Sequence, residues 1–177
     1  MFNFLKNIKE KDPAAQNYLE IILCYPGVHA MMFYKVSHLL YKLHIPVIPR
    51  FISYLASIIT NIEIHPAAKI GRNLFIDHGH AVIIGSDVTI CDNVTIYQGV
   101  TIGGRRIKNA PNAKRHPIIK NNVIIAAGTK ILGDIIIGEN AKIGANSLVI
   151  EDVAANSLII SNKAITKTSA DIIEYYI

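Results

Sequence analysis

The stretch IEIHPAAKIGRNLFIDHGHAVIIGSDVTICDNVTI (62–96) carries an isoleucine every six residues, with one two-residue offset between Ile76 and Ile84. The period returns after a loop at 103–118 and runs on to Val149. A period of six fits neither an amphipathic helix nor an alternating strand. It is typical of a triangular parallel coil in which each short side is one hexapeptide. The thirteen positions that keep the period are Ile64, Ile70, Ile76, Ile84, Ile90, Ile96, Ile102, Ile119, Ile125, Ile131, Ile137, Ile143 and Val149.

Such coils stack on one another. Three sides make a coil of about 18 residues, so equivalent positions of successive coils bury one continuous aliphatic column. Glycine and asparagine recur between the aliphatic positions, and they suit tight corners that need a positive φ. We therefore expect a mainly-β domain of about four to five parallel coils over residues 63–160, from which the loop at 103–118 departs.

Residues 1–62 follow a helical period instead. Two apolar runs have helical spacing; the first ends at Ile45-Pro46 and the second follows Pro49. Asp12-Pro13 has the residue types of a helix start. We expect a small helical domain that covers the open end of the first coil. Its apolar runs are Val28, Met32, Val36, Leu39, Leu40 and Leu43, then Phe51, Ile52, Leu55, Ile58, Ile59 and Ile62.

The positive charge is concentrated in one loop. The formal net charge is +5, from 18 basic and 13 acidic residues. Residues 103–118 (GGRRIKNAPNAKRHPI) hold five basic residues and no acid, so the remaining 13 basic and 13 acidic residues balance. A basic loop attracts phosphate-bearing ligands. Because no aromatic residues are interleaved, we expect no nucleic-acid partner.

Composition also bears on the compartment. The two cysteines, Cys24 and Cys91, do not indicate a disulfide scaffold, and the first residues show no signal-peptide pattern. No run of about 18 apolar residues occurs. We expect a cytoplasmic protein in a reducing environment, without a membrane partner.

An imidazole and a carboxylate stand near the start of the coils. An alcohol is a weak nucleophile at neutral pH and needs a base with a pKa near the working pH, which His78 supplies. A coil places residues about one turn apart side by side, so Glu63 is positioned to orient that ring. Zinc is the alternative, but no pair of histidines has a strong ligand spacing, and we expect no metal. The candidate zinc ligands are His65, His78, His80 and His116.

Several blocks of the chain resemble the serine acetyltransferase family of hexapeptide-repeat acyltransferases, particularly its shorter bacterial members. In the helical part they are DPAAQNYLEIILCYPGVHA (12–30), YKVSHLLY (34–41) and IPVIPRFIS (45–53). In the coils they are IEIHPAAKIG (62–71), IDHG (76–79), YQGVTIGG (97–104), KRHP (114–117) and AAGTKILGDIIIGENAKIGANS (126–147). Together and in this order, these blocks are far more specific than hexapeptide repeats alone.

The resemblance implies a left-handed parallel β-helix and a direct transfer of acetyl from acetyl-CoA to the L-serine hydroxyl, which yields O-acetyl-L-serine for cysteine biosynthesis. By position, His78 is the general base and Glu63 the carboxylate that orients it. The groups that hold the ammonium and carboxylate of the amino acid are Asp12, Asp77, Arg115 and His116. The backbone that lines the acetyl-CoA arm, and whose N–H groups stabilise the oxyanion, belongs to Gly104, Ala126, Ala127 and Gly128.

The resemblance also implies partners. The family forms homotrimers with active sites in clefts between neighbouring coils, and in some members two trimers pair through the helical domain. L-cysteine is the implied feedback inhibitor, because it has the ammonium and carboxylate of serine. The tail (161–177) ends in Glu174-Tyr175-Tyr176-Ile177. In the family such a tail enters the active site of O-acetylserine sulfhydrylase (cysteine synthase), so Tyr176 and Ile177 are the expected contacts.

Three departures from the family pattern bear on substrate choice. The family's DHGTG reads DHGHA here, which puts His80 beside the base. Arg105-Arg106 replaces Thr-Gly, and ISNKAI (160–165) replaces a Val-x-Gly-x-Pro-Ala motif that contacts CoA. Two alternatives stay open: an O-acyltransferase for homoserine or a sugar, or with succinyl-CoA as donor, and an inactive binding partner of cysteine synthase. The charged candidates favour an amino acid, because a sugar offers no paired charges.

Overall fold

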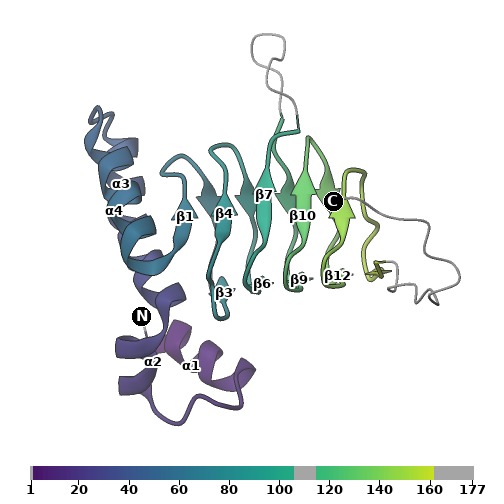
Figure 1. Ribbon diagram of the computed structural model, residues 1–177, viewed down its shortest axis with the longest axis horizontal. Coiled ribbons are helices and arrows are strands. Elements are labelled where there is room, and N and C mark those ends of the chain that lie inside the picture. Colours follow the sequence, from purple (N-terminus) through teal and green to yellow (C-terminus); the bar gives the residue numbers. More distant parts are fainter. Residues whose placement is uncertain (1, 106–114, 162–177) are drawn as a thin grey trace, which may run out of the picture.

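The chain folds into a row of stacked β-coils with helices at one end (Figure 1). The computed structural model describes residues 2–105 and 115–161. The helices are α1 (Phe2–Lys11), α2 (Tyr18–Cys24), α3 (Pro26–Lys42) and α4 (Ile48–Thr60). Short strands follow in three parallel sheets, so the predicted parallel β-helix with a helical N-terminal part is confirmed.

The coils contribute strands to three walls, which we name sheets A, B and C; the last coil has no strand in sheet B, where Val153 makes only an isolated bridge to Ile137. Sheet A contains β1 (Ile62–Ile64), β4 (Val82–Ile84), β7 (Thr101–Gly103), β10 (Lys130–Leu132) and β13 (Leu148–Val149). Sheet B contains β2 (Lys69–Ile70), β5 (Thr89–Ile90), β8 (Ile118–Ile119) and β11 (Ile136–Ile137). Sheet C contains β3 (Phe75–Ile76), β6 (Thr95–Ile96), β9 (Ile124–Ile125), β12 (Lys142–Ile143) and β14 (Leu158–Ile159).

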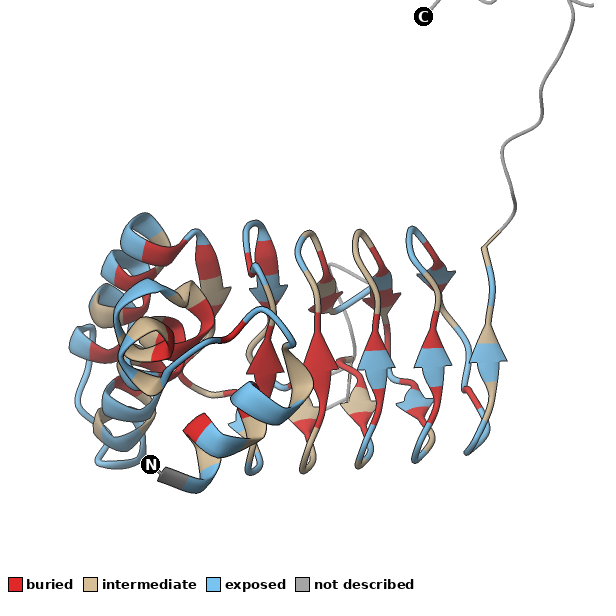
Figure 2. Cartoon of the chain, turned by 90° about the horizontal axis from the view of Figure 1, so that it is seen from below, coloured by how far each residue is buried: buried red, intermediate tan, exposed pale blue. Residues whose placement is uncertain are grey.

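The periodic aliphatic residues form the core. The register pairs Ile64 with Ile84 and Ile84 with Ile102 in sheet A, so the predicted column exists. Twelve of the thirteen periodic side chains are buried, and only Ile70 is partly exposed. Figure 2 shows buried residues on successive strands along most of the solenoid, whereas the last strand, β14, has none. Because burying one such side chain contributes roughly 1.5–3 kcal/mol, this column is the main source of stability of the coils.

One corner of the solenoid carries a ladder of asparagines. The side-chain amide of each of Asn73, Asn93, Asn122 and Asn140 donates to the side-chain oxygen of the asparagine in the next coil, at 2.9–3.3 Å, and Asn156 accepts the last of these bonds. All five residues have φ between 59° and 62°. Asparagine tolerates this left-handed conformation better than most residues. The sequence-based expectation of asparagine at positive-φ corners is thus confirmed, and the amides also link neighbouring coils.

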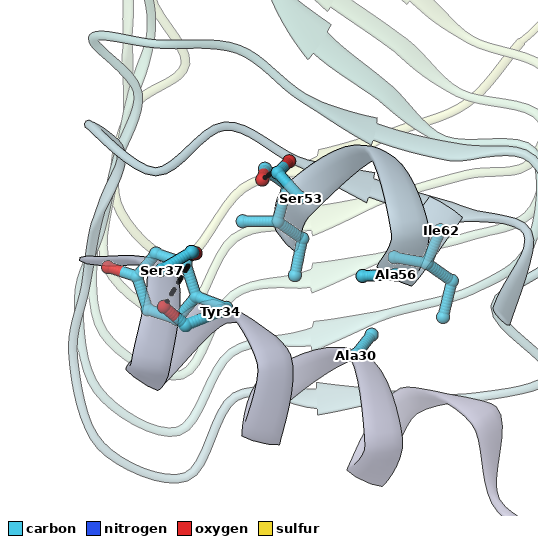
Figure 3. A pocket seen from close by; sticks show the side chains of 7 residues that line it. Ala30, Tyr34, Ser37, Ser53, Ala56 and Ile62 are labelled. Atoms are coloured by element: carbon cyan, nitrogen blue, oxygen red, sulfur yellow. Dashed lines mark hydrogen bonds between the residues drawn. The ribbon is translucent and has the colours of Figure 1, made fainter. Parts of the chain in front are cut away.

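Helices α3 and α4 cover the open end of the solenoid at β1. The Tyr34 hydroxyl donates to Ala68 O at 2.7 Å and the Ser53 hydroxyl to Ile64 O at 2.6 Å. His38 Nδ1 lies 2.7 Å from Pro66 O. These carbonyls belong to the first coil, which has no preceding coil to bond them. A small gap remains between α3, α4 and β1, lined by Ala30, Tyr34, Ser37, Ser53, Ala56, Ile62 and Ile64 (Figure 3).

Two features of the helical part differ from the sequence-based expectations. Asp12-Pro13 does not start a helix: α1 ends at Lys11, and Asn17 caps α2 by accepting from Glu20 N at 2.9 Å. Asp12 instead closes a turn, accepting from Ala14 N at 2.8 Å. The prediction was wrong because the Asn-x-x-Glu pair is the stronger local cap.

The second difference is that many residues of the two predicted apolar helical runs face outward and do not pack on the first coil. We name as the outer face the exposed residues Met32, Val36, Leu39 and Leu43 of α3 and its C-cap, and Phe51, Leu55, Ile58 and Ile59 of α4. In the part of the chain that the structure describes, no helix is long and apolar enough to span a bilayer.

Candidate active site

The corner between sheets C and A carries the first group of predicted site residues. The Tyr25 hydroxyl donates to Asp12 Oδ2. Burial raises the pKa of Tyr25, and the carboxylates of Asp12, Glu20 and Asp77 raise it further. Tyr25 therefore stays a neutral donor, and Asp12 and Asp77 lie in one electrostatic neighbourhood beside it. Lys11 Nζ donates to Asn93 O and Thr95 Oγ1, both at 3.0 Å, and so fixes the end of α1 against sheet C.

His78 lies in the tight turn between β3 and β4. It adopts φ +56°, and Gly79 and Ala81 follow with φ +74° and +58°. A left-handed backbone at a bulky residue is uncommon and costs of order 1–3 kcal/mol, so it needs support from its surroundings. That support includes the bonds from Ala81 N to Asn61 O and from Gly99 N to His80 O, at 2.9 and 2.8 Å. The turn presents His78 as an exposed side chain.

Glu63 projects outward from β1, between the buried Ile62 and Ile64. Its ion-pair partner is Arg50 of α4, at 3.8 Å from Nη1 to Oε1. Both side chains are about half exposed, at 56% and 46%, so the pair contributes at most about 1 kcal/mol. Among the described residues Glu63 makes no hydrogen bond to His78. The orienting role of Glu63 stays a prediction, and the weak pair with Arg50 leaves the carboxylate free to adopt another rotamer.

The second group lies at the corner between sheets A and B, where Arg115 and His116 precede β8. The His116 ring is 8% exposed, and its Nδ1 lies 3.2 Å from Asp87 Oδ2. The ring packs against two glycine turns: a Cβ on Gly85 would lie 2.9 Å from Cδ2, and one on Gly104 3.5 Å from Nε2. Burial lowers the pKa of His116 and Arg115 lowers it further, whereas Asp87 opposes both effects.

His65 is electrostatically coupled to this second group. Its Nδ1 accepts from Ala67 N at 3.0 Å, so the neutral ring carries its proton on Nε2. Burial lowers the pKa of His65; Arg50 and His116 also lower it, while Asp87 and Glu63 raise it. Across residues 2–105 and 115–161, no group of three or more His, Cys, Asp or Glu side chains is arranged to hold a metal ion.

The predicted acetyl-CoA residues divide between the same two corners. Ala126, Ala127 and Gly128 form the turn between β9 and β10, on the corner of His78, whereas Gly104 lies on the corner of His116. The N–H groups of Ala126 and Gly128 already donate to Ile143 O and Gln98 O, both at 2.9 Å. Those of Ala127 and Gly104 have no partner among the described residues. These two N–H groups are therefore the ones available to a ligand.

The two corners lie where the strands of sheet A begin and where they end, and we call these two sides the edges of sheet A. A strand of three residues is about 10 Å long, so His78, Asp12 and Asp77 lie on one edge and Arg115 and His116 on the other. Within one chain the structure does not bring the two groups together. The residues that sequence reasoning missed are Tyr25 and Asp87, and His65 was named only as a candidate zinc ligand. Tyr25 was inside a quoted block, but no spacing linked Asp87 to His116. Tyr176, Ile177 and residues 106–114 of the basic loop lie outside the described residues.

Comparisons with known proteins agree with this architecture. The bacterial transferase hexapeptide (six repeats) family model matches residues 116–151. A serine acetyltransferase from Helicobacter pylori is 48% identical over 164 residues, which cover 93% of this chain and 94% of the relative.

Two solved structures extend the comparison. Serine acetyltransferase isoform 3 from Entamoeba histolytica in complex with cysteine has a TM-score of 0.87 at 36% identity, over 94% of this chain and 58% of that one. Serine acetyltransferase from Neisseria gonorrhoeae in complex with serine has a TM-score of 0.83 at 36% identity, over 92% of this chain and 65% of that one. This chain thus spans less than two thirds of both solved chains, but nearly all of the Helicobacter pylori relative. The chain belongs to the serine acetyltransferase family.

Proposed function

We propose that this chain is a serine O-acetyltransferase that moves the acetyl group of acetyl-CoA to the hydroxyl of L-serine. The observation that carries the proposal is the match to the Helicobacter pylori serine acetyltransferase over 94% of its length. The charges support the same substrate: acids at one edge of sheet A suit an ammonium, and Arg115 with His116 at the other suit a carboxylate.

The chemistry needs one base and one oxyanion site. His78 takes the proton from the serine hydroxyl as its oxygen attacks the acetyl carbonyl carbon. The tetrahedral intermediate then expels CoA as a thiolate, and the His78 imidazolium returns the proton to its sulfur. Glu63 bonds the second ring nitrogen and stabilises the imidazolium. The N–H groups of Ala127 and Gly104 are the proposed donors to the oxyanion, since their neighbours' N–H groups are already bonded.

We propose that the working form is a homotrimer. The ammonium and carboxylate of one amino acid are only a few ångströms apart, whereas the acids and the Arg115–His116 pair occupy opposite edges of sheet A. If neighbouring copies set unlike edges against each other, every interface gains one complete set of groups. Pairing of two trimers through the outer face would in addition cover that exposed apolar surface.

We propose L-cysteine as an inhibitor that competes with serine. It carries the same ammonium and carboxylate, and the Entamoeba histolytica relative was solved in complex with cysteine. The test is the rate at several serine concentrations with and without L-cysteine. Competition predicts a raised KM for serine and an unchanged kcat; a lowered kcat with an unchanged KM would refute it.

We propose cysteine synthase as the protein partner, bound through Tyr176 and Ile177 of the tail. We also propose a cytoplasmic location. Binding to the cognate sulfhydrylase, measured by calorimetry, should be lost on deletion of Ile177. Unchanged binding of the shortened chain would contradict the assignment.

The substrate assignment is tested with a panel. L-serine, L-homoserine and L-threonine are each combined with acetyl-CoA and with succinyl-CoA, and release of CoA is followed with a thiol reagent. The proposal predicts the highest kcat/KM for L-serine with acetyl-CoA. A higher kcat/KM for another pair would leave the proposed mechanism in place and change the substrate assignment. No release of CoA with any pair would favour an inactive binding partner.

A further inference from the structure

The turn after β4 places a carboxylate against the buried imidazole of the next coil. Asp87 lies in the turn that joins β4 to β5, and its Oδ2 is 3.2 Å from Nδ1 of His116. The Ser86 hydroxyl donates to the same oxygen at 3.3 Å and restrains the carboxylate. Asp87 itself is largely exposed, at 65%, whereas His116 Nδ1 is fully buried. Nδ1 and Oδ2 are close enough for a charge interaction but make no formed hydrogen bond, and the contact becomes an ion pair only when His116 is protonated.

This placement fixes where His116 carries its proton. Among the described residues, Asp87 is the one polar group within reach of Nδ1. An ionised carboxylate only accepts, so it favours the neutral tautomer that holds its proton at Nδ1 and leaves a lone pair on Nε2. The ring occupies the space that a side chain on Gly85 would take, since a Cβ there would lie 2.9 Å from Cδ2.

A lone pair on Nε2 cannot bind a carboxylate. To donate to the carboxylate of an amino acid, His116 must first take up a proton at Nε2 and become an imidazolium. We propose that Asp87 is a positioning residue that holds the proton of His116 on Nδ1 and stabilises this imidazolium, so that binding of the substrate carboxylate is coupled to uptake of one proton at His116 Nε2. The inference rests on the proposed function, in which His116 contacts that carboxylate.

The charged groups around the ring set the direction of the pH dependence. Burial and Arg115 lower the pKa of His116, and Asp87 opposes them. His65 also faces His116, with Arg50 and Glu63 behind it. The pKa of His116 in the free enzyme thus lies below its ordinary value, and a bound carboxylate raises it. Serine affinity is then highest below the free-enzyme pKa and falls, up to tenfold per pH unit, until the pH passes the pKa of the complex.

The first test is calorimetry of L-serine binding in two buffers with different enthalpies of ionisation. The wild type should take up close to one proton near neutral pH. Asp87→Asn keeps the size of the side chain and removes its charge, which should lower the pKa of His116 by about one unit. The serine KM at pH 7 should then rise about tenfold, with kcat and the acetyl-CoA KM within about twofold. Asp87→Glu should restore most of the loss, and the exposed corner acid Glu139 supplies the control Glu139→Gln.

The second test reads the ring without turnover. NMR of histidine-labelled protein should show the His116 proton on Nδ1 in the wild type and a lower pKa in Asp87→Asn, while Glu139→Gln matches the wild type. An unchanged ring pKa in a folded Asp87→Asn variant, or a lowered pKa with unchanged proton uptake and serine KM, overturns the inference. If the wild type does not acetylate serine, the proposed function fails, and the NMR titration still decides whether Asp87 controls His116.

Discussion

The separation of the two half-sites makes a quantitative prediction about mixed oligomers. His78 lies on one edge of sheet A and Arg115 on the other, so each proposed site draws His78 from one chain and Arg115 from its neighbour. The variants His78→Ala and Arg115→Ala each damage every site of a pure trimer. We expect pure His78→Ala to lose at least about a hundredfold in rate, and pure Arg115→Ala to lose rate because it binds the serine carboxylate more weakly.

A mixture of the two variants regains intact sites. In trimers formed at random from equal amounts of the two variants, the chain that supplies the His78 edge of a given site has an intact His78 with a probability of one half. The neighbouring chain has an intact Arg115 with the same probability. About a quarter of the sites are then fully intact, and the mixture should recover roughly a quarter of wild-type activity. The two variants are co-expressed with different tags, mixed trimers are isolated by both tags, and CoA release is measured. This isolation removes pure trimers and therefore raises the fraction of intact sites somewhat.

A control mixture uses two defects on the same edge. His78→Ala combined with Asp77→Asn gives no intact site in any arrangement, because both residues lie in the turn between β3 and β4. This mixture should stay as inactive as its components. Recovery in the control, or no recovery with His78→Ala and Arg115→Ala in isolated mixed trimers, would refute the reasoning that one site uses opposite edges of two chains.

Three further changes test the fold and the first half-site. Ile131 is fully buried in β10, so Ile131→Ala should lower the free energy of unfolding, measured by urea titration, by about 2–5 kcal/mol. The control Ile136→Ala changes an exposed residue and should change this free energy by less than about 1 kcal/mol. Similar losses in the two variants would mean that the periodic aliphatic column is not the core. Asn122 has φ +59° and lies in the middle of the asparagine ladder, so Asn122→Ala should lower the free energy of unfolding by about 1–2 kcal/mol. Asn122→Gly should lower it less, because glycine adopts this conformation without strain. Equal losses in the two variants would assign the effect to the lost amide bonds alone. Tyr25→Phe removes the hydrogen-bond donor to Asp12, so it should raise the KM for serine about threefold to tenfold and leave the KM for acetyl-CoA unchanged. An unchanged KM for serine would mean that the turn alone holds Asp12 in place.

The repeat pattern predicted the coils well because its cause is simple. An aliphatic residue every six positions has to face the interior of a three-sided coil, and twelve of the thirteen are buried. The expectation of a positive φ was wrong for the glycines that directly follow these residues: for Gly71, Gly138 and Gly144, where a Cβ would lie under 3.0 Å from atoms of the next coil, and also for Gly85. Its φ is not positive, and its missing side chain makes room for the ring of His116.

Helical periodicity was less informative, because it shows an apolar stripe and not what covers it. Val28 is buried, whereas Met32, Val36 and Leu39 of the same run face outward. The side of α3 that packs on the coils is instead made by Ala30, Met31, Tyr34 and Ser37. Small and polar residues at a close helix–sheet contact carry no strong signal in a single sequence.

Individual site residues could be recognised from sequence blocks, but their grouping could not. Which edge of sheet A a residue occupies depends on the count of residues in every preceding turn. The loop at 103–118 interrupts that count just before Arg115 and His116. For the same reason Asp87 and His116, 29 positions apart in the sequence, gave no spacing that would pair them.

The central claim is that this chain acetylates L-serine with His78 as the base. Its most direct test is to incubate the purified wild type and His78→Ala with acetyl-CoA and L-serine, and to measure both free CoA and O-acetyl-L-serine by mass spectrometry. We expect equal amounts of the two products from the wild type and a loss of at least about a hundredfold in His78→Ala. CoA without O-acetyl-L-serine, or a His78→Ala variant as fast as the wild type, would contradict it.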